Sequence, residues 1–155
     1  MMKQKLMLIL GVLALCIVIL TACSGKTSQN ADGTPSTLKS RYLGYYRSDT
    51  DNATYFDETT NDFDVNKSTI SDGTEIESHI KTYQVLSEDE LASNFKGPAE
   101  KNKAESNSND TIFYIQIKGS DQSIYQVKLS DGGKKIKIIS LGDGWDQFVF
   151  TGVAK

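Results

Sequence analysis

Cys23 is the residue whose surroundings best suit a chemical reaction. A thiol is a nucleophile that can accept a lipid as a thioether, and the small side chains of Thr21 and Ala22 before it let a peptidase approach the backbone. Two lysines precede an apolar run over residues 6–20, which falls short of the roughly 20 residues of a membrane-spanning helix. This order of basic, apolar and small residues is the layout of a cleaved export signal.

The sequence Leu20-Thr21-Ala22-Cys23 resembles the lipobox of bacterial lipoproteins. The resemblance implies that Cys23 receives diacylglycerol on its sulfur and that the chain is then cleaved in front of it, so that residues 1–22 are a signal peptide. It also implies a protein anchored by lipid to the cell membrane and facing the extracytoplasmic side. An uncleaved anchor helix and a plain secretory signal are the alternatives.

The remaining residue types do not form a catalytic or metal-binding set in the sequence. Cys16 lies in the apolar run, so the exported part keeps no free thiol, disulfide or thiolate metal site once Cys23 is modified. His79 is the only histidine, whereas a catalytic zinc needs about three protein ligands. The nucleophile elbow Gly-x-Ser-x-Gly is absent, and the acidic residues from position 49 onward depart from the EF-hand pattern. We therefore expect a non-enzymatic protein without cofactor or metal.

The charge of the chain counts against nucleic acid as a partner. There are 17 basic and 20 acidic residues, and without the two lysines of residues 1–22 the net charge falls from −3 to about −5. Nucleic-acid binding requires clustered Lys or Arg that release counterions from phosphates. Here the basic residues are scattered, apart from Lys134, Lys135 and Lys137.

The length and composition predict one folded domain, over residues 41–155, behind a lipidated flexible tether of residues 23–40. The tether is rich in Ser, Gly, Thr, Asn and Asp, and Leu38 is its only sizeable apolar residue. Such a segment has little to bury.

Short segments bounded by turn residues predict a mostly β fold. The strand candidates cover residues 41–47, 53–57, 62–66, 68–71, 74–86, 111–118, 123–130, 134–141 and 145–151. In the last four, alternate apolar residues share one face with those of the neighbouring strand, as Phe113 does with Val127. Ile139 and Leu141 break this alternation, which indicates either a bulge or a sheet covered on both sides. We expect an antiparallel barrel or sandwich of about seven or eight strands with one short helix; the alternative is an α+β fold with the helix on a four- or five-stranded sheet.

Ser87 and Glu90 form the pattern of a capping box and predict a short helix over about residues 88–95. Leu91 and Phe95, four residues apart, are expected to cover one patch of core. Gly97-Pro98 is expected to end this helix, with an exposed polar loop over residues 99–110.

The opening Gly44-Tyr45-Tyr46 and the closing run of hairpins resemble small lipocalin-like β-barrels. The resemblance implies an interior that can hold a small apolar ligand. Exposed aromatic residues are typical of binding surfaces, and Tyr45, Tyr114 and Trp145 are the candidates for such a ligand or partner patch. Filling of the core is the alternative role for each ring.

The predicted function is a membrane-anchored, non-enzymatic binding module for a small apolar ligand or an envelope partner. The alternative is a protein-directed inhibitor, immunity or exclusion lipoprotein at the cell surface. A large internal cavity favours a ligand carrier, whereas a filled interior and an exposed patch favour the protein-directed role.

Overall fold

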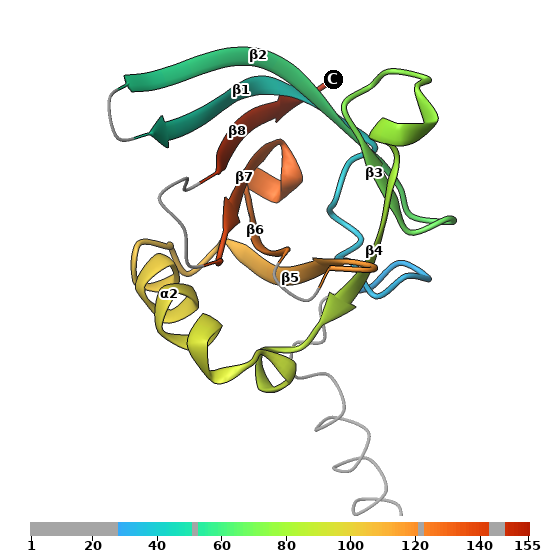
Figure 1. Cartoon of the computed structure of the whole chain (residues 1–155). Helices are drawn as coiled ribbons and strands as arrows, with labels where there is room; N and C mark the ends of the chain where they lie inside the picture. Colours follow the sequence, from blue (N-terminus) through green and yellow to red (C-terminus); the bar gives the residue numbers. More distant parts are fainter. Residues whose placement is uncertain (1–27, 51–52, 121–122, 143–147) are drawn as a thin grey trace, which may run out of the picture.

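The chain folds into a closed antiparallel β-barrel (Figure 1). A computed structural model describes residues 28–50, 53–120, 123–142 and 148–155, and only the backbone over residues 48–50 and 53–57. Each strand pairs with the next along the chain, and the last pairs with the first. The strands are β1 (Arg41–Thr50), β2 (Ala53–Asp64), β3 (Thr69–Ser71), β4 (Lys81–Leu86), β5 (Thr111–Ile117), β6 (Ile124–Ser130), β7 (Lys135–Ser140) and β8 (Val149–Ala154). The predicted fold class, a small mostly β barrel with a helix, is confirmed.

The barrel interior is built from the alternating apolar residues that the sequence predicts. Phe113 lies opposite Val127, and Ile115 lies opposite Tyr125, in the register of β5 and β6. Aromatic rings from β1, β2 and β4 meet the same cluster. Its buried members are Leu38, Tyr42, Phe63, Tyr83, Phe113, Ile115, Val127, Leu129, Ile136, Ile138 and Phe150. Burial of these side chains is the main favourable contribution to the stability of the barrel.

A second apolar layer lies outside the barrel wall, under the helix α2 (Ser93–Ala104). Its buried members are Leu91, Phe95, Ala99, Tyr114, Ile124 and Leu141. The predicted shared patch of Leu91 and Phe95 is therefore confirmed. Ile139 and Leu141, which break the alternation of β7, are 7% and 1% exposed. Of the two explanations that we considered for them, cover on both sides of the sheet is the one observed.

The predicted end of the helix is wrong. The α-helix begins at Ser93 and continues through Gly97 and Pro98 to Ala104, over part of the expected loop. Proline has no N–H to donate, so Pro98 costs one helical hydrogen bond. The buried side chains of Phe95 and Ala99 hold the helix to the barrel on either side of that position.

The predicted capping box is present one turn upstream of α2. The backbone nitrogen and hydroxyl of Ser87 donate hydrogen bonds to Oε2 of Glu90, at 2.7 and 2.8 Å. They enclose the short 3₁₀ turn η2 (Glu88–Glu90). This turn brings Leu91 into the layer beneath α2.

Residues 28–40 cover one end of the barrel, so the expectation of a flexible tether reaching residue 40 does not hold for them. Thr34 and Leu38 are 0% and 7% exposed. The backbone nitrogen of Lys39 donates to the hydroxyl of Tyr42, which in turn donates to the carbonyl of Gly133, each at 2.9 Å. A polar composition does not reveal such packing, because the partners of the segment come from distant strands.

The two ends of the barrel therefore differ. In this topology alternate connections lie at opposite ends, so the end covered by residues 28–40 also carries the β2–β3, β4–β5 and β6–β7 connections. We call it the closed end. The other end carries the β1–β2, β3–β4, β5–β6 and β7–β8 connections, and we call it the open end; residues 51–52, 121–122 and 143–147 of these connections lie outside the described residues.

Candidate functional site

The open end of the barrel contains an apolar chamber of about 180 Å³, which we call the open-end chamber. Its apolar lining consists of Ile70, Ile115, Ile117, Tyr125, Ile138 and Phe148. The ring of Phe148 stacks on that of Tyr46 at a centroid distance of 4.6 Å and meets Tyr125 edge-on at 5.9 Å. Burial raises the pKa of Tyr125 above its ordinary value, so its phenol is neutral at physiological pH. One side of the chamber is thus uncharged and apolar, whereas Asp72 and Lys81 bring charged groups to the rest of its lining.

The β3–β4 connection supplies much of the polar lining of this chamber and is held in place by Asp72. The carboxylate of Asp72 accepts hydrogen bonds from the nitrogen and hydroxyl of Thr74, at 3.0 and 2.6 Å, and contacts Nδ1 of His79 at 2.7 Å. The two bonds from Thr74 are the main cause of the lowered pKa of Asp72. Thr60 on β2 donates to the carbonyl of Asp72 at 2.5 Å. These bonds fix the connection against the edge of the barrel.

His79, Asp72 and Thr74 lie together but do not form a catalytic triad. Both Asp72 and Thr74 contact the same ring nitrogen of His79, at 2.7 and 3.3 Å. A nucleophile–His–Asp triad needs the nucleophile and the carboxylate on different ring nitrogens. The cluster therefore stabilises the connection and does not activate the Thr74 hydroxyl.

The aromatic residues predicted to form a binding patch lie in different environments. Tyr45 is 58% exposed on the outer face of β1, whereas Tyr114 is 4% exposed beneath α2. Tyr114 points away from the barrel interior as expected, but α2 covers that face of β5, so its ring is part of a core and not of a surface. Trp145 and the predicted lipid attachment residue Cys23 lie outside the described residues.

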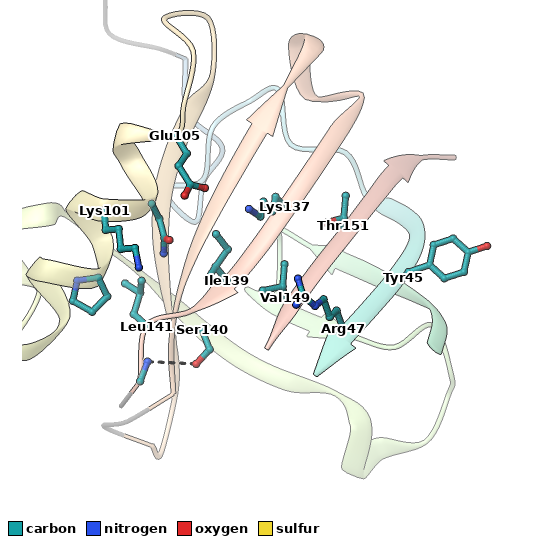
Figure 2. A pocket seen from close by; sticks show the side chains of 13 residues that line it. Tyr45, Arg47, Lys101, Glu105, Lys137, Ile139, Ser140, Leu141, Val149 and Thr151 are labelled. Atoms are coloured by element: carbon teal, nitrogen blue, oxygen red, sulfur yellow. Dashed lines mark hydrogen bonds between the residues drawn. The ribbon is translucent and has the colours of Figure 1, made fainter. Parts of the chain in front are cut away.

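A second hollow, of about 590 Å³, lies between α2 and the outer faces of β1, β7 and β8. We call it the outer groove. Figure 2 shows Lys101 on α2 and Glu105 just after it on one side, Lys137 and Arg47 on the strand side, and Tyr45 pointing away. Ile139, Leu141 and Val149 provide apolar lining between them. The sequence interpretation missed this groove; its only sign was the cluster of lysines that includes Lys137.

In the part of the chain that the structure describes, no three His, Cys, Asp or Glu side chains are grouped as metal ligands. Across the same residues, no helix has both the length and the apolar character that a membrane crossing requires.

Comparison of the chain with protein-family models, with curated proteins and with solved structures finds no match in any of the three.

Proposed function

We propose that this chain is a lipid-anchored extracytoplasmic protein, without enzymatic activity, that binds a small apolar ligand in the open-end chamber. The observation that carries the proposal is a hollow of about 180 Å³ whose exposed lining is mostly isoleucine, tyrosine and phenylalanine side chains. Such walls bind by dispersion and by the release of water from apolar surface. An apolar cavity of about 150 Å³ in another protein binds benzene. The ligand expected here is therefore of that size, or is the end of a longer apolar group.

The filled half of the barrel sets this size limit. Tyr42, Phe63 and Tyr83 form edge-to-face ring contacts, with centroids 6.2 Å apart in each pair, and residues 28–40 cover the end beyond them. Ligand pockets for drug-sized molecules usually measure about 300–1,000 Å³. The chamber is smaller, so it suits a small ligand and does not suit a large one enclosed along the barrel axis.

A membrane anchor at Cys23 would lie close to the closed end of the barrel. Only residues 24–27 separate Cys23 from the packed segment, and a chain extends by at most about 3.5 Å per residue. Lipidation at Cys23 would therefore hold the closed end within about 18 Å of the bilayer surface. The open-end chamber would then face away from the membrane, toward the medium.

The anchor is tested on the full chain produced in a bacterium that processes lipoproteins. We expect mass spectrometry to find diacylglycerol on Cys23 and no residues before it, and the Cys23→Ala variant to leave the membrane fraction. An intact amino terminus, or a Cys23→Ala variant that stays with the membrane, would refute the anchor.

The ligand site is tested by NMR of isoleucine methyl groups with toluene as the probe. Toluene should shift the methyl signals of Ile115, Ile117 and Ile138, while Ile112, which contacts the layer beneath α2, serves as an internal control. Ile117→Trp should fill the chamber and abolish the shifts, whereas Val153→Trp, at a position 48% exposed on β8, should not. Equal shifts inside and outside the barrel, or shifts that survive Ile117→Trp, would contradict this site.

A protein-directed role is the second candidate, and two exposed side chains favour it. Ile76 and Ile80, on the β3–β4 connection at the open end, are 52% and 42% exposed. Large apolar side chains exposed on an ordered connection are typical of protein interfaces. A photocrosslinker at position 76 should then capture one defined envelope protein in cells, and one at position 153 should not. Identical products from both positions would count against this role.

A further inference from the structure

The outer groove gathers positive charge on a protein whose net charge is −3. Among the described residues of its lining, Arg47, Lys101 and Lys137 are basic and Glu105 alone is acidic. Within the described ranges, Lys101 and Lys137 take part in no ion pair. Other lysines of the chain do pair, namely Lys67 with Asp64, Lys103 with Glu88, and Lys128 with Asp110.

The two unpaired ammonium groups come from opposite walls of the groove. Lys101 projects from α2 and Lys137 from β7 (Figure 2). The walls of a cleft concentrate the positive potential of such groups. An anion placed between them is attracted by both.

The groove also has the size of a small-molecule site, and its mainly polar lining includes several apolar side chains. Its volume of about 590 Å³ falls within the usual range of about 300–1,000 Å³ for such sites. Ile139 and Leu141 at its base are held by the barrel and by the layer beneath α2, and Val149 adds a further apolar side chain. A convex basic patch would suit a membrane surface, whereas a concave groove of this size suits a single small molecule.

We infer that the outer groove is a second binding site, which takes a small organic anion with a phosphate or carboxylate group and a short apolar part. The anionic group lies between Lys101 and Lys137, and the apolar part covers Ile139 and Val149. The site is separate from the open-end chamber, because β7 lies between them: Ile138 lines the chamber, and its neighbours Lys137 and Ile139 line the groove. The inference therefore does not depend on the proposed function.

The site is tested with hexyl phosphate as the probe, by calorimetry and by NMR of backbone amides at low and physiological salt. We expect saturable shifts in residues 98–105 and 137–141, and binding that weakens with salt. Lys101→Gln and Lys137→Gln should each weaken binding about fivefold or more, the factor expected for one charge at contact distance in water. The matched controls Lys96→Gln, on α2, and Lys118→Gln, after β5, remove a charge outside the groove lining and should bind like the wild type.

Three further probes decide the chemistry of the ligand. Hexanoate should bind at the same residues, inorganic phosphate more weakly, and the neutral alcohol hexanol should leave residues 137–141 unshifted. The inference is overturned if hexanol binds as well as hexyl phosphate, if the two groove variants bind like their controls, or if the shifts fall in the chamber. Binding to phosphatidylglycerol vesicles that exceeds binding of hexyl phosphate would assign the groove to a lipid surface and would also overturn it. Unchanged circular dichroism of all four variants establishes that each is folded.

Discussion

The hydroxyl of Tyr83 donates a hydrogen bond of 2.6 Å to a carboxylate oxygen of Asp32 and so ties the N-terminal segment to β4. The other oxygen of Asp32 accepts bonds from the nitrogen and hydroxyl of Thr34, at 3.0 and 2.7 Å. Burial, and then the bond to Asp32, raise the pKa of Tyr83 far above its ordinary value. The phenol therefore stays protonated and remains a donor over the physiological pH range.

Replacement of Asp32 with Ala should destabilise the protein and loosen residues 28–40. The buried hydroxyl of Tyr83 would lose its acceptor, a change that costs about 1–3 kcal/mol. Guanidinium unfolding measures the loss, and limited proteolysis reports the exposure of the segment. Tyr83→Phe is the matched variant and should cost less, because Asp32 is only partly buried and can bind water in place of the phenol. Unchanged stability and proteolysis for Asp32→Ala would show that this bond does not hold the segment.

Gly44→Ala should disrupt the seam that closes the barrel. Gly44 on β1 lies opposite Gly152 on β8, and a Cβ at Gly44 would stand 2.0 Å from the carbonyl oxygen of Thr151. The backbone must move to relieve this contact, and overpacking of this kind costs about 1–3 kcal/mol or more. A lower unfolding midpoint in guanidinium would record the loss.

Gly97→Ala is the control for that substitution and should change the unfolding midpoint much less. Gly97 lies within α2, and no atom from another part of the structure lies within 4 Å of a Cβ built there. Alanine is favoured over glycine in a helix by about 1 kcal/mol, which offsets the crowding of its Cβ by the following Pro98. If Gly97→Ala lowers the midpoint as much as Gly44→Ala does, the proposed clash at Gly44 is not the cause.

Phe95→Ala should weaken the attachment of α2 to the barrel. Phe95 is 5% exposed in the layer that also holds Leu91 and Tyr114. Removal of a buried phenylalanine ring costs about 3–5 kcal/mol. Hydrogen exchange should become faster in α2 than in β5–β7, because the barrel interior keeps its own core. Equal acceleration throughout would mean that the helix and the barrel unfold as one unit.

Acid should reduce the stability of the protein through Asp110. The pKa of its carboxyl is lowered, chiefly because the backbone nitrogen of Asn107 donates to it at 2.9 Å. A carboxyl whose pKa is lower in the folded state stabilises that state above its unfolded pKa and loses the contribution as pH falls through the folded one. The thermal midpoint should therefore fall as pH is lowered below about 4. Asp110→Asn should show a smaller fall over this interval, and an unchanged pH dependence would exclude Asp110 as a source.

Strands β5, β6 and β7 could be predicted because their information is local, whereas the predicted strands 53–57 and 62–66 are parts of the single strand β2 and the predicted strand 74–86 is shortened to β4. Alternation of residues such as Phe113 and Ile115 on β5 fixes which face is buried, and turn residues mark where each strand ends. The helix was harder to delimit, because Pro98 is locally unfavourable and is tolerated only through the burial of Phe95 and Ala99.

The closed end and the outer groove depend on contacts between distant parts of the chain, which local sequence patterns do not contain. Asp32 looks like an ordinary loop residue until Tyr83 is brought to it. Lys101 and Lys137 look like solvated lysines until α2 is placed beside β7. In both cases the register of the barrel, and not the residue types alone, produces the relationship.

A single strand, β7, separates the open-end chamber from the outer groove. Successive residues of that strand face opposite compartments, so the backbone of one strand separates the chamber from the groove. Any occupant that pushes β7 outward must narrow the groove, and any occupant of the groove that pushes it inward must shrink the chamber. The position of β7 therefore couples the capacities of the two compartments.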